Sequence, residues 1–276
     1  NEVVLILAGT PIGNIGDASA RLLVTLQQAQ VIAAEDTRSL LKLANHLGIK
    51  LNAELISLNE QNELQKLDRL VEIASTGNLV LVSDAGMPTI SDPGFALVRA
   101  CSEQGVEIQV VPGPSSVIAA LAVSGLSTDR FSFEGFIPRK SSERKKYFQK
   151  LVSETRTMIF FESPHRITES LEDAEAVFGG ERKASLSREL TKKFEQTLRG
   201  TLAELSDLAK DLKGEMVLVV AGAEQTEVSP ESLVDKVLEL RLQGHSLKDA
   251  ARAVASEHGA SKSELYDLAL KSKPSS

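Results

Sequence analysis

Three segments of the chain have the composition of ligand-binding loops. They are residues 9–17 (GTPIGNIGD), 83–94 (SDAGMPTISDPG) and 110–116 (VVPGPSS), all rich in small and turn-forming residues. Small residues let a ligand approach the main chain closely enough to bind its N–H and C=O groups. Each segment follows an apolar run, so we expect it where a strand ends. Because the carboxyl ends of parallel strands meet at one edge of a sheet, the segments predict one cofactor-binding wall.

The glycine spacing of residues 9–17 argues against the two standard phosphate-binding loops. The pattern is G-x-x-x-G-x-x-G, whereas the dinucleotide fingerprint is G-x-G-x-x-G, and no lysine follows the last glycine as a Walker loop requires. An acidic pair, Glu35 and Asp36, does follow the second apolar run, so an NAD-dependent oxidoreductase stays open as an alternative. A tight strand-to-helix turn without a ligand would use the same glycines.

The elements that must position these loops alternate between strands and helices. Apolar runs of strand length occur at residues 3–9, 31–36, 78–86 and 107–113. Between them lie amphipathic stretches, such as 18–29 and 62–75, with apolar residues at i, i+3 and i+4. The alternation predicts a parallel sheet covered by helices on both faces.

The second half of the chain predicts a further α/β unit. Its expected strands are residues 155–163, 183–190 and 214–222, and its expected helices are residues 167–178 and 202–212. Short connections suit hairpins as well as crossovers, so we expect mixed strand directions. The polar, basic segment 135–146 (GFIPRKSSERKK) separates the halves, and we expect the inter-domain connection near it.

From residue 226 onward the sequence predicts a linker and a small helical extension. A helix start at Ser229-Pro230, a stop at Gly244 and N-caps at Ser246 and Ser261 give three short helices, the last two arranged as in a helix-turn-helix. The predicted fold class is α/β, with two α/β domains, residues 1–134 and 135–225, and a helix-turn-helix-like extension, residues 226–276. A helical bundle that contacts no nucleic acid has the same pattern.

The composition limits the classes of function. The 276 residues carry a formal net charge of −7, which argues against coating nucleic acid through bulk electrostatics but allows a local basic patch. The single cysteine, Cys101, cannot form an intrachain disulfide and is expected to be a buried structural thiol. The first apolar run is too short to span a membrane, so we expect a cytoplasmic protein. The four histidines are scattered and predict no metal site, and we expect His165 to be structural.

Eight motifs in order give the chain a family resemblance. GTPIGNIGD, AEDTR, SDAGMPTISDPG, VVPGPSS, EGFIPRK, FFESPHR, RELTKKFE and GEMVLVV resemble the tetrapyrrole-methylase superfamily, from about residue 3 to 224. The motifs AEDTR, SPHR and RELTK make the match specific. With them the chain looks most like the family's ribosomal RNA branch, the small-subunit methyltransferases I, which 2'-O-methylate a cytidine of 16S rRNA. The helical tail is similar to the C-terminal extension of that branch.

The resemblance implies two α/β domains that bind S-adenosylmethionine in the cleft between them. It also implies a homodimer, 16S rRNA or the small ribosomal subunit as partner, and neither a membrane nor a metal. Carried over by position, the cofactor-binding residues are Pro11, Asp84, Ala85, Gly86, Ile90, Ser115, Ser116, Phe161, Leu190 and Met216.

One departure from the family bears on the substrate. Many relatives that methylate tetrapyrroles have Gly-Asp-Pro in the second loop, where this chain has Gly86-Met87-Pro88. That disfavours a porphyrinoid substrate. A methyltransferase of the same fold that acts on a small molecule such as a tetrapyrrole stays an alternative.

The expected reaction is methyl transfer from a sulfonium to a ribose hydroxyl, which requires alignment in a dry cleft. The hydroxyl is a poor nucleophile, so we expect Glu189 or Glu35 to accept its hydrogen bond as a general base. Basic side chains near the cleft predict phosphate contacts, and the expected RNA-binding residues are Arg38, Arg139, Lys140, Arg144, Lys145, Arg166, Arg188 and Lys192. Salt bridges and a solvated helix face would use the same charges without RNA. A non-catalytic ribosome-binding module would share the basic patch and the helical tail.

Overall fold

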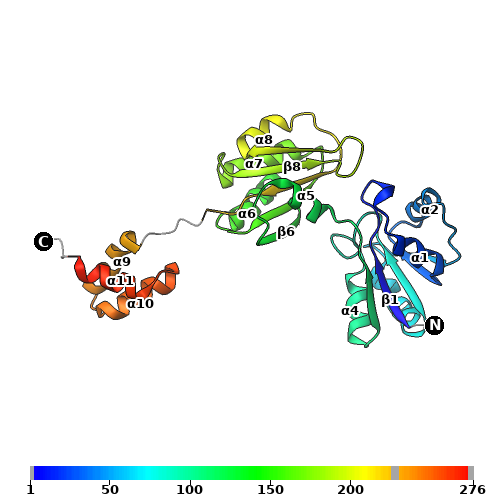
Figure 1. Ribbon diagram of the computed structural model, residues 1–276, viewed down its shortest axis with the longest axis horizontal. Coiled ribbons are helices and arrows are strands. Elements are labelled where there is room, and N and C mark those ends of the chain that lie inside the picture. The colour runs from blue at the N-terminus through cyan, green and yellow to red at the C-terminus, as the bar shows by residue number, and fades with distance from the viewer. Residues whose placement is uncertain (1–2, 225–229, 273–276) are drawn as a thin grey trace. The chain divides into compact units, whose positions relative to one another are not determined.

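The computed structural model describes residues 3–224 and 230–272. The chain divides into two units, Asn1–Ala223 and Glu224–Ser276. The first unit contains two five-stranded sheets with their helices, and the second is helical (Figure 1). The predicted fold class, an α/β protein with a helical extension, is therefore confirmed.

The first sheet is parallel throughout, in the order β3-β2-β4-β1-β5. Its strands are β1 (Val4–Ala8), β2 (Val31–Ala34), β3 (Glu54–Ser57), β4 (Asn78–Val82) and β5 (Glu107–Val111). The four apolar runs of the sequence form β1, β2, β4 and β5. Strands that are covered on both faces have continuous apolar sequences. The short β3, whose sequence is ELIS, lies at the edge of the sheet and has no such run.

Helices cover both faces of the first sheet. α1 (Ala20–Gln28) and α2 (Thr37–His46) pack on one face, and α3 (Glu63–Thr76) and α4 (Phe95–Glu103) pack on the other. Cys101 of α4 is fully buried in the apolar core that α3 and α4 form with the sheet. The prediction of a buried structural thiol is confirmed.

The second sheet has mixed strand directions, as the sequence predicts. In the order β6-β7-β10-β8-β9, β6 is parallel to β7 and the other pairs are antiparallel. Its strands are β6 (Phe131–Phe136), β7 (Thr157–Glu162), β8 (Lys183–Arg188), β9 (Gln196–Thr201) and β10 (Met216–Val220).

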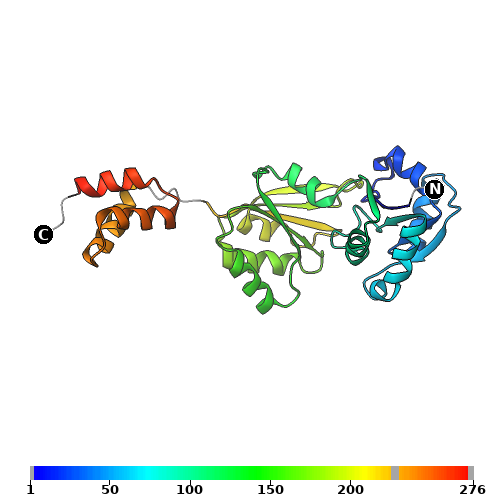
Figure 2. The same ribbon diagram turned by 90° about the horizontal axis from the view of Figure 1, so that it is seen from below.

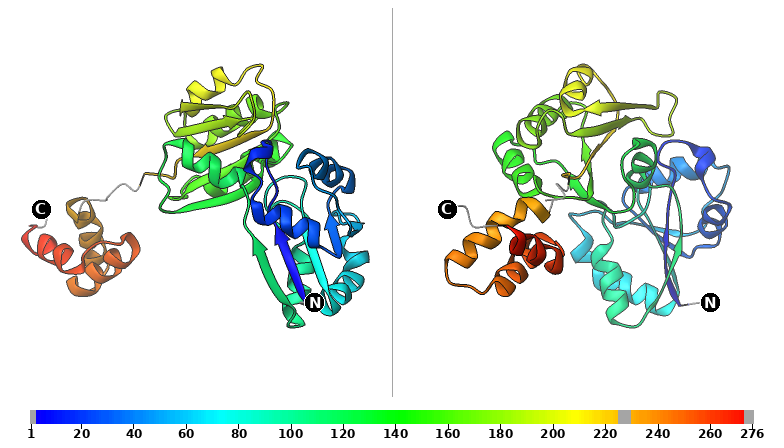
Figure 3. Two further views of the ribbon diagram at one scale, coloured as in Figure 1. Left: turned by 45° about the vertical axis from the view of Figure 1, so that its right-hand side comes forward. Right: turned by 60° about the vertical axis from the view of Figure 1, so that its left-hand side comes forward.

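Four helices pack on this sheet, seen from three further directions in Figures 2 and 3. α6 (Ser141–Leu151), α7 (Ile167–Phe178) and α8 (Leu202–Leu208) share an apolar core with one face. α5 (Ser116–Ser124) packs on the opposite face, against β10 and β8. The apolar core between α5 and the sheet also includes Ile12, from a loop of the first sheet, and Leu190, from a loop of the second.

The segment 135–146 is not an inter-domain connection, contrary to expectation. Its first residues complete β6, and α6 begins at Ser141. The segment is polar because α6 lies on the surface and buries only Arg144 and Phe148. The chain passes between the sheets earlier, after β5 ends at Val111 and before α5 begins at Ser116. The predicted boundary after residue 134 therefore falls inside β6.

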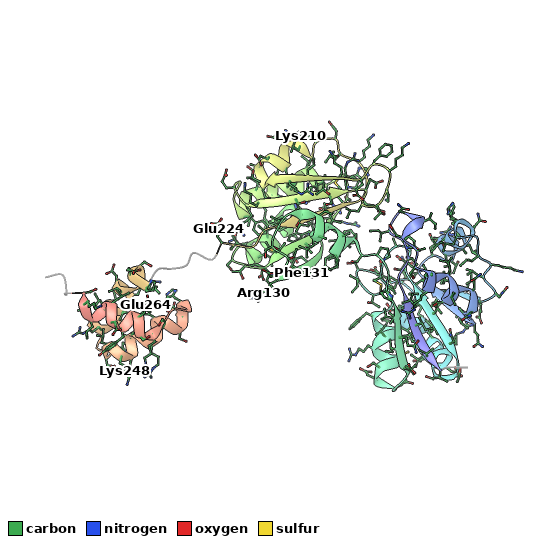
Figure 4. The ribbon with its side chains drawn as sticks, in the orientation of Figure 1. Arg130, Phe131, Lys210, Glu224, Lys248 and Glu264 are labelled. Atoms are coloured by element: carbon green, nitrogen blue, oxygen red, sulfur yellow. The ribbon has the colours of Figure 1, made fainter. Side chains whose placement is uncertain are left out.

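Within residues 230–272 the second unit is a bundle of three helices, α9 (Pro230–Leu242), α10 (Leu247–His258) and α11 (Lys262–Lys271). Apolar side chains of all three form its core. Lys248 of α10 and Glu264 of α11, labelled in Figure 4, are exposed. None of the helices within residues 3–224 and 230–272 is both long and apolar enough to cross a membrane.

The helix starts of this unit follow from its serine residues. Ser246 and Ser261 accept hydrogen bonds from Asp249 N and Glu264 N, so both are the N-caps that the sequence predicts. The predicted cap Ser229, with most of the predicted linker, lies outside the described residues.

Two glycines allow the ends of β1 and β5 to approach each other closely. Gly9 N donates to Val111 O at 2.9 Å. A Cβ on Gly113 would lie 2.6 Å from the carbonyl carbon of Gly9, and a Cβ on Gly9 would lie 2.6 Å from Gly113 Cα. Because the contact is main chain against main chain, no side-chain rotation relieves it. Both positions therefore require glycine.

We expect Gly113→Ala to lower the free energy of unfolding by about 1–3 kcal/mol, the usual range for overpacking. Chemical denaturation followed by circular dichroism measures the loss. Gly180→Ala is the matched control, because the nearest atoms to a Cβ there are side-chain atoms at 3.4 Å. Equal destabilisation in the two variants would contradict the close contact.

Candidate active site

The three small-residue loops are joined to one another at the end of the first sheet. Thr10 and Gly86 exchange two main-chain hydrogen bonds, of 2.9 and 3.1 Å, which tie the first loop to the second. The contact of Gly9 with Gly113 ties the first loop to the third. The prediction that the three loops converge on one face is confirmed.

A cavity of about 380 Å³ lies between these loops and the second sheet. This volume is in the range of small-molecule sites. The three small-residue loops contribute Ile12, Ala85, Asp92 and Ser116 to its wall, the last of which is also the first residue of α5. The second sheet and its loops contribute Phe136, Phe161, Glu162, Ser163, Pro164, Leu190, Glu215, Met216 and Val217.

Half of the predicted cofactor residues line this cavity, namely Ala85, Ser116, Phe161, Leu190 and Met216. The other five, Pro11, Asp84, Gly86, Ile90 and Ser115, belong to the same loops but are not part of the wall. Pro11 and Ser115 each lie one residue before a residue of the wall, Ile12 and Ser116, respectively, and only Ile12 is absent from the prediction. Gly86 acts through its main chain, which pairs with Thr10.

Asp92, in the second small-residue loop, is a residue of the cavity wall. The N-cap of α4 is Gly94, and the carboxylate of Glu63 accepts the main-chain hydrogen bonds of Gly94 N and Ala96 N, both at 3.0 Å. Because Glu63 from α3 fills the capping role, the Asp92 carboxylate remains on the cavity wall. Glu63 lies 31 and 33 residues before the two N–H groups that it binds, so no local sequence signal could have revealed these contacts.

The carboxylates of Glu35, Asp84 and Asp92 lie close enough to influence one another. Burial, then the charge of Glu35, raises the pKa of Asp92 from its usual 3.8 to about 6. Burial also raises the pKa of Glu35, and a hydrogen bond from Asp84 N opposes that rise. A carboxylate with a pKa near 6 is ionised at neutral pH and is a better proton acceptor than an ordinary aspartate.

Glu189 is held in a network of its own. Its carboxylate accepts from Glu215 N at 3.0 Å and from Lys192 Nζ at 3.2 Å. The hydrogen bond from Glu215 N, with the Lys192 contact, lowers the pKa of Glu189. Neither Glu189 nor Glu35 is part of the cavity wall. These contacts make Glu189 a weaker base than Asp92.

The second-domain wall contains a buried carboxylate and an unpartnered hydroxyl. The Glu162 carboxylate accepts from Ser163 N at 2.7 Å, Arg166 Nη2 at 2.8 Å and Ser170 Oγ at 2.6 Å. Ser163 Oγ is buried and has no hydrogen-bond partner among the described residues. Ser163 lines the cavity, but its hydroxyl oxygen is itself closed to solvent. No group of three or more His, Cys, Asp or Glu side chains in the described part of the chain could hold a metal ion.

Arg144 is not available to RNA, which corrects the prediction for this residue. Its side chain is 1% exposed. Its guanidinium lies 2.7 Å from the Asp173 carboxylate and also donates to Pro138 O and Arg139 O. The cation is therefore part of the packing between α6 and α7.

The other predicted RNA-binding side chains reach solvent to different degrees. Arg139 is exposed, and Arg38, Lys140 and Lys145 are 83, 77 and 51% exposed but contact Asp36, Glu143 and Asp173, respectively. Lys192 and Arg166 are 27 and 28% exposed and pair with glutamates, whereas Arg188 donates to Gln196 and Lys213 O. Their RNA role stays a prediction.

The strand order bears on the dinucleotide alternative. In a dinucleotide-binding sheet β1 and β2 are neighbours, so an acidic residue at the end of β2 reaches the ribose next to the β1 loop. Here β4 lies between β1 and β2. Glu35, after β2, accepts from Asp84 N after β4. This arrangement does not provide the ribose contact that the alternative requires.

Two family models match separate parts of the chain. Residues 4–206 match the model for tetrapyrrole (corrin/porphyrin) methylases. Residues 227–273 match the model for the RsmI C-terminal HTH domain.

Individual relatives give two levels of similarity. The chain is 45% identical over 273 residues to the ribosomal RNA small subunit methyltransferase I of Mycobacterium tuberculosis (strain CDC 1551 / Oshkosh), covering 98% of this chain and 95% of the relative. It is 45% identical over 276 residues to the Haemophilus influenzae protein of the same name, covering 97 and 96%. The crystal structure of uroporphyrin-III-C-methyltransferase from Thermus thermophilus superposes with a TM-score of 0.55 and 19% identity over 80% of this chain and 94% of that one. That structural likeness shows a shared fold.

We expect Arg144→Ala to destabilise the first unit by about 3–5 kcal/mol, because the buried Asp173 carboxylate loses its guanidinium partner. Lys145→Ala removes a half-exposed partner of the same carboxylate and should change stability by about 1 kcal/mol or less. Denaturant unfolding of both variants compares them directly. If the Arg144→Ala protein were as stable as the Lys145→Ala protein, the guanidinium would have no structural role.

Proposed function

The chain belongs to the tetrapyrrole methylase family, and from that premise we propose that it transfers a methyl group from S-adenosylmethionine to the 2'-hydroxyl of a cytidine in 16S rRNA. The single observation that carries this proposal is 45% identity, over nearly the whole of both chains, to relatives named ribosomal RNA small subunit methyltransferase I. The match of residues 227–273 to the RsmI C-terminal domain supports the same branch. We further propose a homodimer located in the cytoplasm, as the family resemblance implies.

The cavity residues fit S-adenosylmethionine. Apolar side chains such as Ile12, Leu190 and Val217 suit an adenosine, and the Ser116 hydroxyl can bond its polar edges. The carboxylates of Glu35, Asp84 and Asp92 favour a ligand with a sulfonium and an ammonium charge. We propose that Pro11, Asp84, Gly86, Ile90 and Ser115 contribute to this site from the loops that form the wall. When bound, S-adenosylmethionine supplies an electrophilic methyl group.

Asp92 is the residue best placed to accept the proton of the ribose hydroxyl. Its carboxylate lines the cavity, and its pKa of about 6 matches a base that works at neutral pH. The Asp92 carboxylate would take up the proton that the ribose hydroxyl loses when its oxygen is methylated. Glu35 assists by keeping the pKa of Asp92 raised. Glu189, in this account, holds Lys192 and the turn at Glu215 in place.

The substrate class separates this chain from the tetrapyrrole enzymes that share its fold. Basic side chains that reach solvent at least in part can hold RNA phosphates without reading sequence, and those proposed to do so are Arg38, Arg139, Lys140, Lys145, Arg188 and Lys192. Arg166 contributes to the Glu162 network beside the cavity. A net charge of −7 on the whole chain makes such local positive groups necessary for RNA binding.

We expect the protein to incorporate methyl groups from S-adenosylmethionine into small ribosomal subunits, or their rRNA, from a strain that lacks the modification. Mass spectrometry of the digested rRNA should identify 2'-O-methylcytidine. Titration calorimetry should show binding of S-adenosylmethionine and none of NAD. Methylation of a tetrapyrrole with no incorporation into rRNA would favour the small-molecule alternative.

We expect Asp92→Asn to lower kcat by about 10²- to 10⁴-fold, the usual contribution of a general base. In the unaltered protein kcat/KM should fall as the pH drops through about 6, because protonation of Asp92 removes the base. Steady-state methylation between pH 5 and 8 measures both effects. Glu189→Gln is the comparison variant and should retain activity within about tenfold. An unchanged acidic limb in Asp92→Asn would remove Asp92 from this role.

The same pKa shift predicts an effect on stability. The unfolded chain releases the Asp92 proton near pH 4 and the folded chain near pH 6, so ionisation of Asp92 destabilises the fold as the pH rises between these values. Asp92→Asn should therefore raise the melting temperature at pH 7.5, and the gain should shrink below pH 5. Scanning calorimetry at both pH values tests this, and a variant that melts lower at pH 7.5 would contradict it.

A further inference from the structure

The loop that joins β8 to β9 carries an exposed aromatic side chain with no role in the chemistry of methyl transfer. Phe194 is 65% exposed in a loop that spans Glu189–Glu195. Leu190 of the same loop is 8% exposed and lines the cavity. One residue of the loop thus packs on the site while another, four positions later, faces solvent.

Hydrogen bonds hold this loop in one conformation. Glu189 N donates to Glu215 O at 3.0 Å, Lys192 N donates to Glu189 O at 3.0 Å, and Thr191 N donates to the Glu195 carboxylate. Glu189 and Thr191 have positive φ angles, of 50° and 68°, which non-glycine residues rarely adopt. Backbone strain of this kind persists where the surroundings enforce it, and it concentrates at functional sites. Phe194 is therefore presented from a rigid support.

The position of Phe194 places it within reach of a substrate that enters the cavity. Four residues of chain span at most about 14 Å, so Phe194 Cα lies within that distance of Leu190 Cα on the cavity wall. The loop also contacts the first cofactor loop, because a Cβ on Gly13 would lie 2.5 Å from Lys192 Cγ. The exposed ring therefore lies near the cavity and not on a remote surface.

Positive charge accompanies the ring. Lys193 Nζ lies 5.6 Å from the ring centre of Phe194. Within the described residues Lys193 has no carboxylate within 4.0 Å, whereas the acidic groups around it are engaged: Glu189 and Glu215 contact Lys192, and Glu195 accepts from Thr191 N. An aromatic face beside an unpaired lysine is the combination with which proteins bind single-stranded nucleic acid.

We propose that Phe194 is a stacking platform for an unpaired base of the RNA next to the acceptor nucleotide, and that Lys193 contacts the adjoining phosphate. This inference rests on the proposed function, because it takes RNA as the substrate. A second copy of the chain is the competing occupant of Phe194. The lysine over the ring disfavours it, since charged residues, lysine among them, are depleted at the centres of protein–protein interfaces.

The absence of tryptophan from the chain allows a direct test. Phe194→Trp introduces the only indole into a protein with no tryptophan, so its fluorescence reports on residue 194 alone. Saturating 16S rRNA fragment that contains the methylated cytidine should quench this emission, because stacking on a base alters the indole surroundings. Phe131→Trp is the matched control: Phe131, labelled in Figure 4, is 39% exposed at the start of β6, five residues before the cavity residue Phe136. Its emission should not change.

Kinetics of further variants separate stacking from folding. Phe194→Ala should raise KM for rRNA on the order of 5- to 100-fold, the range reported for loss of one stacked base, and should leave the calorimetric Kd for S-adenosylmethionine unchanged. Phe194→Trp should restore KM, and Phe194→Leu, which keeps an apolar side chain without an aromatic face, should not. A raised Kd for S-adenosylmethionine in Phe194→Ala, or full rescue by Phe194→Leu, would overturn the proposal.

The outcomes also distinguish the proposal from its premise. RNA that binds, by anisotropy of a labelled fragment, without quenching Phe194→Trp would overturn the stacking role and leave the proposed function intact. Emission that shifts to the blue with protein concentration, before RNA is added, would assign Phe194 to a contact between copies of the chain. A protein that neither binds nor methylates rRNA would fail the proposed function itself.

Discussion

The main-chain pairing of Thr10 with Gly86, beside the contact of Gly9 with Gly113, is the constraint on which the candidate site depends. Each of the three loops follows a different strand, and only their direct contact turns three separate turns into one wall. The contacts use main-chain atoms, so they require small residues at fixed positions and leave nearby side chains free. The cavity wall and the placement of Ser116 follow from that arrangement.

Groups of like charge lie in separate local regions of this protein. The cavity wall and its surroundings gather three carboxylates that would attract a cationic methyl donor, whereas a polyanionic acceptor requires positive groups. Acidic groups follow the ends of β2 and β4, and basic groups lie on α6 and the β8–β9 loop. Net charge describes neither region, because both attractions act over a few ångströms and are screened beyond about 10 Å.

Several charged residues of the recognisable motifs form structural contacts. Arg144, although it lies in the most basic stretch of the sequence, is buried against Asp173. Arg166 and Glu162 satisfy each other beneath the cavity, and Glu189 binds Lys192 and the main chain at Glu215. A motif therefore identifies the neighbourhood of a site more reliably than it identifies which charge meets the ligand. Burial and hydrogen-bond partners decide the second question.

The amino-acid sequence by itself determined the alternation of strands and helices, the three small-residue loops and the helical extension. These features depend on local patterns: apolar runs for β1 and β4, glycine and proline at strand ends, and serine caps at Ser246 and Ser261. Only the tertiary structure decided which side chains face the cavity. Glu63 caps α4 from a different helix and leaves Asp92 on the cavity wall, and Ile12 joins Leu190 across two sheets. Such contacts join residues far apart in the chain, so no window of sequence contains both partners, and their energies come from burial that exists only after folding.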